Sequence, residues 1–339
     1  MLYQFQFQTY HRKFKRPLQT SHGVWDIRAG IILKLTDEKG QIGWGEIAPL
    51  SWFGSETFDQ ALDFCTSLPT NISKETIFAI SSELPACQFG FESALSNSCS
   101  GSASILHEAE NSRYSGLLPA GKTALSALQT LWQQGFRTFK WKIGVAAMDE
   151  ELQVFQQLIE AMDDLGDRDP VFLRLDANGG LNYSQAETWL NTGDNLLKNP
   201  DLSVTIEFLE QPLPVSQFDK MLALSAVYKT PIALDESVAN LDRIQECYEG
   251  GWRGIFVIKP AIAGSPSQLR KFCEIHPIDA VFSSVFETQI GRQAALNLAR
   301  QLSLNSRALG FGTDDWFDDK NHSILDFGFD ITTDNSKSS

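Results

Sequence analysis

The sequence predicts an α/β protein in which an α+β domain precedes a (β/α) barrel. From about residue 117 onward, short apolar segments alternate with amphipathic ones, which is the pattern of repeated βα units around a parallel sheet. Before that point, alternating apolar and polar residues give way to helical spacings, which indicates antiparallel strands followed by helices. We therefore expect a first domain at residues 1–113 and a barrel at residues 114–310.

Composition narrows the possible functions. A chain of 339 residues with 42% hydrophobic content can bury a large core, or two ordinary ones. Its formal net charge of -14 argues against a nucleic-acid or anionic membrane partner, since both require clustered positive charge. No apolar run approaches the length of a membrane span, and residues 1–17 lack the apolar region of a signal peptide. We expect an anionic small-molecule substrate to be met by local lysines.

Cysteine usage predicts a reducing compartment. The five cysteines are odd in number and widely scattered, and none forms a C-x-x-C motif. Neither a disulfide framework nor a zinc site is indicated, so a cytoplasmic setting is expected. The oligomeric state stays open, with a monomer slightly favoured.

The first domain begins with a strand, because Tyr3, Phe5 and Phe7 alternate with glutamines. The basic cluster at residues 11–16 is expected to form a solvated hairpin turn, followed by strands at residues 30–36 and 42–46. Helical spacings then run from about residue 56 to residue 106, with breaks at Pro69 and Pro85.

Eight apolar segments in the second half are expected to be strands. They lie at residues 117–120, 139–143, 171–175, 205–209, 232–234, 255–258, 280–282 and 308–309. Amphipathic segments such as residues 124–134, 150–163, 217–228, 241–248, 266–275 and 292–302 separate them. Eight successive βα units favour a closed barrel over an open doubly wound sheet.

Two lysines share one face of the second of these strands. Lys140 and Lys142 alternate with apolar residues, so their side chains point the same way. Two close ammonium groups repel each other, which offers a route to a depressed lysine pKa and hence to a base. For an isolated K-x-K, a solvent-facing edge strand is the commoner explanation.

Charged residues also end the next four strands. Asp176, Glu210, Asp235 and Lys259 each follow an apolar run, and the βα loops of a barrel open on one face. Any single carboxylate of this kind often caps the next helix. Three that converge need a compensating cation, and all-oxygen ligands select Mg²⁺, with Mn²⁺ as a possibility. A divalent ion between two lysines suits removal of the proton next to a substrate carboxylate.

The chain resembles the enolase superfamily in its muconate-lactonizing-like branch. The resemblance rests on K-x-K at 140–142, R-L-D-A-N at 174–178, E-Q-P at 210–212, L-D-E-S at 234–237, K-P at 259–260 and the serines at 283–284 followed by Glu287, together with G-W-G-E-I-A-P-L at 43–50 and residues 53–57 after it. It implies that the first domain caps the barrel and that residues 311–339 return to it. The polar tail at residues 335–339 is expected to be disordered.

The resemblance also implies roles for the site residues. Lys142 would remove the substrate proton and then act as the acid, while Lys259 would stabilise the intermediate as a cation. Lys140 would tune Lys142 or contact the substrate carboxylate. The candidates for substrate binding are Arg174, Asn178, Ser283 and Ser284, for each of which a structural role is equally open.

Three alternatives differ in chemistry. The resemblance favours a dehydrating carbon–oxygen lyase, whereas dipeptide epimerisation or N-acylamino acid racemisation would use the same lysines and carboxylates. Residues 116–123 also match the phosphate-loop pattern G-x-x-x-x-G-K-T. The segment before that motif is polar, the apolar strand falls inside the loop and Pro119 removes a backbone donor, all of which argue against nucleotide binding.

Overall fold

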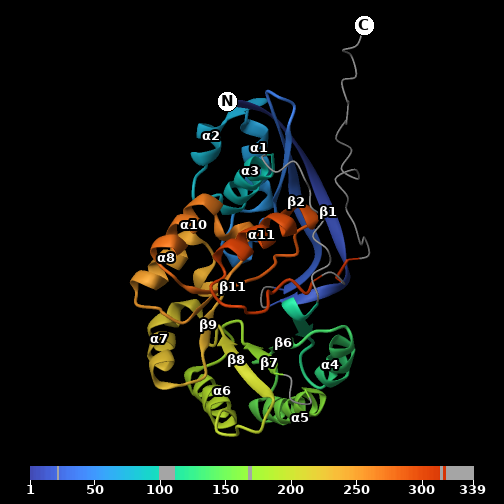
Figure 1. Ribbon diagram of the computed structural model, residues 1–339, viewed down its shortest axis with the longest axis vertical. Coiled ribbons are helices and arrows are strands. Elements are labelled where there is room, and N and C mark those ends of the chain that lie inside the picture. Colours follow the sequence, from blue (N-terminus) through green and yellow to red (C-terminus); the bar gives the residue numbers. More distant parts are fainter. Residues whose placement is uncertain (21–22, 99–110, 167–169, 314–315, 318–339) are drawn as a thin grey trace.

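Two sheets organise the molecule (Figure 1). The computed structural model describes residues 1–20, 23–98, 111–166, 170–313 and 316–317. A four-stranded antiparallel sheet has the order β3-β2-β1-β4, and a seven-stranded parallel sheet has the order β11-β10-β9-β8-β7-β6-β5. The parallel order follows the chain, as expected for consecutive βα units of a barrel.

The antiparallel sheet belongs to the N-terminal part of the chain. Its strands are β1 (Leu2–Thr20), β2 (Gly23–Asp37), β3 (Ile42–Ile47) and β4 (Asn71–Ser73). The helices η1 (Ser51–Phe53), α1 (Phe58–Ser67), α2 (Lys74–Phe78) and α3 (Pro85–Ser98) follow. Helix α3 lies against β3 so closely that a Cβ on Gly45 would stand 2.0 Å from the carbonyl oxygen of Gly90.

The basic cluster at residues 11–16 is not a turn, and this prediction was wrong. These residues continue β1, and His11 to Lys13 pair with residues 27–29 of β2. The strand continues because Tyr10 and Phe14 are buried on one face while most of the basic side chains between them are exposed. The Arg12 guanidinium stacks 3.7 Å from the ring centroid of Phe317, which supplies a partner that the local sequence does not show.

The parallel sheet and its helices form the second unit. Its strands are β5 (Ser115–Leu118), β6 (Thr138–Lys142), β7 (Val171–Asp176), β8 (Val204–Glu210), β9 (Ile232–Leu234), β10 (Ile255–Ile258) and β11 (Asp279–Phe282). The helices are η2 (Asn111–Arg113), α4 (Thr123–Gln133), α5 (Met148–Gly166), α6 (Tyr183–Leu196), η3 (Val215–Gln217), α7 (Phe218–Val227), η4 (Glu236–Val238), α8 (Leu241–Glu249), α9 (Pro260–Ala263), α10 (Pro266–Ile275) and α11 (Gln289–Leu302). Residues 116–118 lie in β5 and pair with β6, so they form a strand and not a phosphate-binding loop.

The expected eighth strand is reduced to two bridges that close the barrel. Tyr114 pairs with Leu309 and Ser283 pairs with Gly310, both in parallel. The Ser115 amide donates to the Leu309 carbonyl at 2.9 Å, and the Gly310 amide donates to the Phe282 carbonyl at 2.8 Å. The segment at residues 308–310 therefore joins β5 to β11, the two edges of the seven-stranded sheet.

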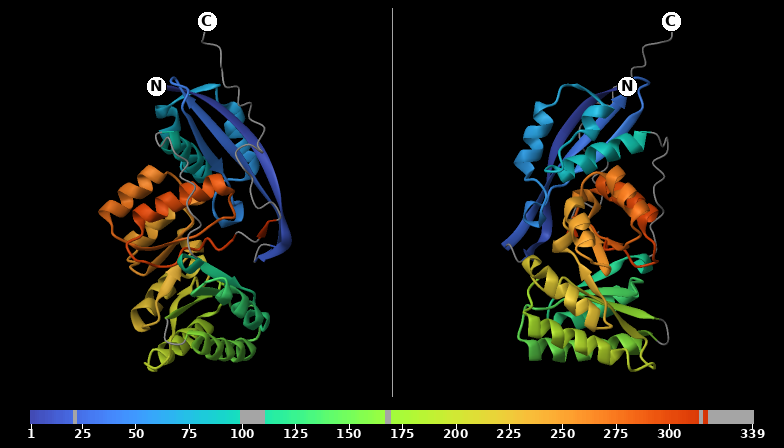
Figure 2. Two further views of the ribbon diagram at one scale, coloured as in Figure 1. Left: turned by 45° about the vertical axis from the view of Figure 1, so that its right-hand side comes forward. Right: turned by 90° about the vertical axis from the view of Figure 1, so that its left-hand side faces the viewer.

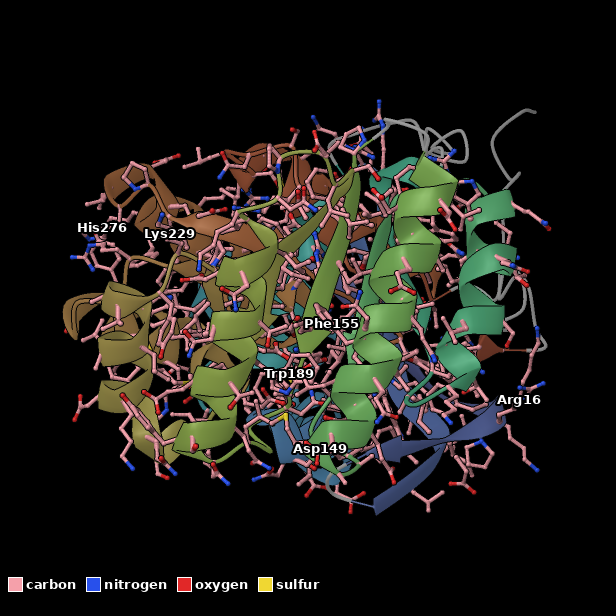
Figure 3. The ribbon with its side chains drawn as sticks, turned by 90° about the horizontal axis from the view of Figure 1, so that it is seen from below. Arg16, Asp149, Phe155, Trp189, Lys229 and His276 are labelled. Carbon is pink, nitrogen blue, oxygen red and sulfur yellow. The ribbon has the colours of Figure 1, made fainter. Side chains whose placement is uncertain are left out.

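Large aromatic side chains fill the space between the sheet and its helices. Figure 3 shows Phe155 of α5 and Trp189 of α6 between neighbouring helices. The ring of Trp189 lies 5.4 Å from that of Phe155 and 6.2 Å from that of Trp141 on β6. A separate interior cluster fills the barrel itself and consists of Phe208, Ala233, Ile255, Val257 and Val281. Strands β8 to β11 thus carry buried apolar side chains on both faces, as in other closed parallel sheets.

Two carboxylates of the N-terminal unit cap helices of the barrel. Glu46 of β3 is fully buried and accepts hydrogen bonds from the amides of Thr288 (2.9 Å) and Gly291 (2.9 Å) at the start of α11. Glu92 of α3 accepts from Ser265 and from the Ser267 amide (2.9 Å) at the start of α10. A carboxylate at a helix N-terminus satisfies orphan amides and opposes the helix dipole. The turned views in Figure 2 show α10 and α11 beneath the antiparallel sheet.

The described C-terminal residues contact the first sheet. Phe317 forms an antiparallel bridge with Phe14, and the two rings lie 4.6 Å apart. Residues 318–339, including the tail expected to be disordered, lie outside the described residues. The domain boundaries at 113 and 310 stay predictions. Across the described ranges, no helix combines the length and apolar character needed to cross a membrane.

Candidate active site

Five charged residues converge at the C-terminal ends of neighbouring barrel strands. Lys142, Asp176 and Glu210 are the last residues of β6, β7 and β8, and the strand register places them level with one another. Asp235 and Lys259 come directly after β9 and β10. The apolar runs before them supply the buried strands, so each charged side chain lies where its strand leaves the core.

Lys140 bridges two of the carboxylates. Its ammonium nitrogen lies 2.8 Å from Asp176 Oδ2 and 2.7 Å from Glu210 Oε1. Burial acts to lower the Lys140 pKa, but the charges of Asp176, Glu210 and Asp235 outweigh it and raise that pKa above its usual value. The expected repulsion with Lys142 therefore does not make Lys140 a base, because the nearby carboxylates neutralise it.

Lys142 is placed differently. Its side chain is half-buried at the end of β6, and it makes no hydrogen bond or ion pair with any residue that the structure describes. Of the two lysines on this strand, Lys142 is therefore the one whose ammonium group is free to approach a substrate. The alternation that separates it from Lys140 by one residue keeps both on the same face.

The carboxylate on the other side, Asp235, pairs with Lys259. Its ammonium group forms an ion pair with Asp235, and the ring of Phe53 from η1 lies 3.7 Å from the Lys259 nitrogen. Burial raises the pKa of Glu210 to about 8, assisted by the charge of Asp176. Burial also raises the pKa of Asp235 to about 6, against the opposing effect of Lys259. Positive charge at this site is therefore strongly favoured.

The donor set fits a hard divalent cation. Asp176, Glu210 and Asp235 offer only oxygen ligands, the type that Mg²⁺ prefers. In the described part of the chain, no group of three or more His, Cys, Asp or Glu side chains is drawn close enough to hold a metal ion. The ammonium groups of Lys140 and Lys259 form ion pairs with these three carboxylates. The Oε2 atom of Glu236 is buried and has no hydrogen-bond partner among the described residues, so a cation bound nearby would stabilise this carboxylate.

Arg174, a candidate for substrate binding, is buried and already has two hydrogen-bond partners, so its role in substrate binding stays a prediction beside a structural one. The side chain is 1% exposed, and its guanidinium donates to Glu207 Oε2 at 2.6 Å and to the Ala308 carbonyl at 2.7 Å. Sequence alone could not show this, because both partners are remote along the chain.

The other candidates lie at the rim of the site. Asn178 adopts a left-handed conformation with φ of 44° and donates to Glu236 Oε1 at 3.2 Å. Ser283 lies in the closing bridge and contacts the Gly310 carbonyl at 3.3 Å. Ser284 donates to Glu287 at 2.9 Å within the loop before α11. The hydroxyl of Ser284 is thus hydrogen-bonded within its own loop, while Asn178 and Ser283 lie near the strand ends.

Sequence reasoning missed Glu236 and the contact of Phe53 with Lys259. Glu236 directly follows Asp235, so a second acidic residue after the same strand was the available signal. Phe53 lies in the segment after residues 43–50 that resembles the superfamily's capping-domain loop, but the sequence did not show that its ring contacts Lys259.

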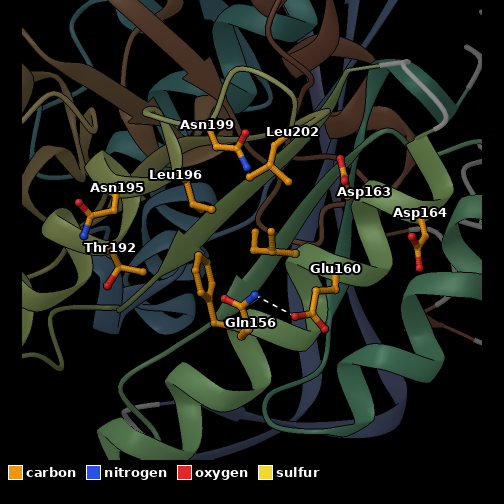
Figure 4. Close-up of a pocket in the computed structure, with 11 residues that line it drawn as sticks. Gln156, Glu160, Asp163, Asp164, Thr192, Asn195, Leu196, Asn199 and Leu202 are labelled. Atoms are coloured by element: carbon orange, nitrogen blue, oxygen red, sulfur yellow. Dashed lines mark hydrogen bonds between the residues drawn. The ribbon is translucent and has the colours of Figure 1, made fainter.

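A hollow of about 480 Å³ on the molecular surface lies away from these residues. Side chains of α5, α6 and the segment before β8 line it, and Gln156 donates to Glu160 across part of its wall (Figure 4). None of the converging charged residues belongs to it. We therefore place the chemistry at the strand ends and not in this hollow.

A barrel with lysines on either side of three strand-end carboxylates, joined to an α+β unit, defines a member of the enolase superfamily. Family models match in agreement with this: "Enolase C-terminal domain-like" covers residues 123–331, and "MenC, N-terminal domain" covers residues 6–98.

Known proteins identify the family more closely. The o-succinylbenzoate synthase of Thermosynechococcus vestitus is 38% identical over 313 residues, 92% of each chain. A crystal structure of o-succinylbenzoate synthase from Thermosynechococcus elongatus, with magnesium in its active site, matches with a TM-score of 0.81 over 93% of this chain and 94% of that one. The L-Ala-D/L-Glu epimerase of Bacillus subtilis, at 20% identity, a TM-score of 0.68, and coverage of 92% and 89%, shares the fold. The chain belongs to the o-succinylbenzoate synthase family.

Proposed function

We propose that this enzyme dehydrates 2-succinyl-6-hydroxy-2,4-cyclohexadiene-1-carboxylate to 2-succinylbenzoate, a hydro-lyase reaction of menaquinone or phylloquinone biosynthesis. The observation that carries the proposal is the asymmetry of the site: Lys142 is unpaired among the described residues, whereas Lys259 is bound to Asp235. A single free base suits an elimination in which one residue handles both proton steps. The family relationship supplies the substrate class, a small carboxylate.

Asp176, Glu210 and Asp235 would hold the metal, which we take to be Mg²⁺ with Mn²⁺ as a possible substitute. When bound, the ion supplies a Lewis acid for the substrate carboxylate and neutralises the charge that develops there. Lys140, which lies between two of these ligands, would then be released toward the substrate carboxylate. The raised pKa of Glu210, due first to burial, fits a group that is deprotonated when a cation arrives.

Lys142 removes the proton from the substrate carbon next to the carboxylate. The electron pair of that C–H bond moves into the carboxylate system. It then returns to form the new ring double bond as the C–O bond to the hydroxyl group breaks, and the ammonium of Lys142 gives the proton to the departing hydroxide. Loss of water leaves the aromatic ring. Both transfers occur on one face, so the elimination is syn. Lys259, with its charge fixed by Asp235 and shielded by Phe53, stabilises the negative intermediate without exchanging protons.

Asn178 and Ser283 are proposed to contact the substrate from the rim. Asn178 follows β7, and its side-chain amide donates a hydrogen bond to Glu236. Ser283 lies in one of the two bridges that close the barrel. Ser284 is a weaker candidate for contact with the substrate, because its hydroxyl already donates a hydrogen bond to Glu287.

A cytoplasmic location completes the proposal, and the oligomeric state stays open with a monomer slightly favoured. The described cysteines at positions 65, 87, 247 and 273 are all free, in keeping with a reducing environment. The net charge of -14 gives no support to nucleic-acid or membrane binding.

The test is a direct assay of the purified enzyme with Mg²⁺, following the loss of cyclohexadiene absorbance. Dipeptides and N-acylamino acids are run beside the cyclohexadiene substrate, with epimerisation followed by deuterium incorporation. We expect turnover of the cyclohexadiene, abolished by EDTA and by Lys142→Ala. Efficient deuterium exchange into both enantiomers of an N-acylamino acid, without dehydration of the cyclohexadiene, would instead establish the racemase alternative.

A further inference from the structure

Strand β8 contains one residue more than the adjoining part of β7. Leu173 pairs with Ile206, but the next residue, Arg174, pairs with Phe208. Asp176 then pairs with Glu210. Glu207 is therefore the extra residue of a β-bulge, a feature that re-aims side chains near active sites.

The bulge changes which residues of β8 face the barrel interior. Ile206 and Leu209 belong to the outer core beneath the helices, whereas Phe208 belongs to the interior cluster. Strict alternation from Ile206 would turn Phe208 and Glu210 outward as well. With the extra residue in place, Glu207 and Phe208 both point inward, and Glu210 faces the same way as Asp176.

Arg174 contacts both residues that the bulge turns inward. Its Nε lies 2.6 Å from Glu207 Oε2, and its guanidinium lies 4.9 Å from the ring centroid of Phe208. Glu207 is 8% exposed and also accepts from Arg307 at 2.9 Å. Arg174 precedes Asp176 by two residues on β7, so it occupies the interior layer directly below that carboxylate.

We propose that Arg174 and Glu207 are positioning residues: their ion pair holds the bulge in β8 and thereby sets Glu210 level with Asp176. The inference deepens the proposed function, since it assumes that these two carboxylates bind the metal. A buried pair of this kind rarely stabilises a fold more than apolar residues of similar volume would. Its specific effect should therefore be seen in metal affinity and not in stability.

The experiment measures Mg²⁺ affinity by calorimetry on the full-length enzyme without substrate. The central variant is the double substitution Arg174→Met with Glu207→Leu, which replaces the pair by apolar groups and leaves no unpaired buried charge. We expect a Kd for Mg²⁺ that is weaker by about 10- to 100-fold, the usual effect of losing groups that orient metal ligands. Near-ultraviolet circular dichroism and the melting temperature in EDTA check that the variant is folded.

Two further variants make the result decisive. Glu207→Asp keeps the charge but shortens its reach, so it should weaken Mg²⁺ binding less than the double variant; it also serves as the test if the double variant does not fold. Glu246→Gln removes the exposed Arg243–Glu246 pair, whose side chains are 59% exposed, and should leave the Kd unchanged.

A folded double variant, or a folded Glu207→Asp enzyme, that binds Mg²⁺ as tightly as the wild type would overturn the inference. The readout is independent of turnover. A wild-type enzyme that binds Mg²⁺ yet fails to dehydrate the cyclohexadiene would refute the proposed function and leave the positioning role standing.

Discussion

Replacing Lys140 with methionine should destabilise the metal-free protein and enlarge its response to Mg²⁺. The Lys140 ammonium neutralises Asp176 at 2.8 Å and Glu210 at 2.7 Å, and the side chains of these carboxylates are only 10% and 2% exposed. Removing one partner from a buried ion pair typically costs about 3–5 kcal/mol. For a chain of 339 residues, at roughly 2 °C per kcal/mol, Lys140→Met should melt about 6–10 °C below the wild type in EDTA.

Magnesium changes that comparison, because the ion performs the neutralisation that the lysine no longer provides. In the wild type, Mg²⁺ must displace the Lys140 ammonium, whereas in Lys140→Met it meets uncompensated carboxylates. Differential scanning calorimetry should therefore show a larger Mg²⁺-induced rise in melting temperature for the variant. Lys271→Met, at an exposed position of α10, is the matched control and should behave as the wild type. An equal or smaller rise in the variant would show that lysine and metal do not share this site.

Three more predictions test the chemistry and the pH dependence of stability. Lys142→Ala should lower kcat at least 10²- to 10⁴-fold, since the residue performs both proton transfers, with Mg²⁺ affinity measured as a check on the site. Lys259→Arg should impair dehydration yet still release the substrate α-proton to deuterated water; blocked exchange in this variant, retained in Lys142→Arg, would reverse the assignment. In EDTA, stability should fall as pH rises from about 5 to about 8, because the raised pKa values of Asp235 (about 6) and Glu210 (about 8) mean that the folded state keeps protons that the unfolded state has lost. Urea titrations across that range measure the trend, and rising stability would contradict it.

The strand ends could be predicted because each depends on local sequence. An apolar run such as residues 171–175 must be buried, and the charge that follows it marks where the strand leaves the core. The order of the βα units then brings those ends together without further information. This reasoning predicted that Asp176, Glu210 and Lys259 lie at strand ends. It did not predict that lysines form ion pairs with the carboxylates.

The features that were not predicted depend on partners that are remote in sequence. The resemblance offered Arg174 as a candidate for substrate binding with a structural role equally open, and the sequence did not show that Glu207 and the Ala308 carbonyl bind its guanidinium. The bulge at Glu207 leaves no local trace, since residues 204–210 form an unbroken strand-like run. The basic cluster in β1 likewise extends a strand because Phe317, from the far end of the chain, covers Arg12.

The first amides of the barrel helices α10 and α11 donate hydrogen bonds to carboxylates of the N-terminal unit. Without Glu46 and Glu92, the first amides of both helices would lose the acceptors that the N-terminal unit supplies. Each loss of a capping group costs about 0.5–2 kcal/mol, and the apolar contacts between the units would be lost with it. We therefore expect the two units to unfold in a single cooperative transition. A first domain exchanged from a relative would need a carboxylate at each of these two positions for the barrel helices to keep their caps.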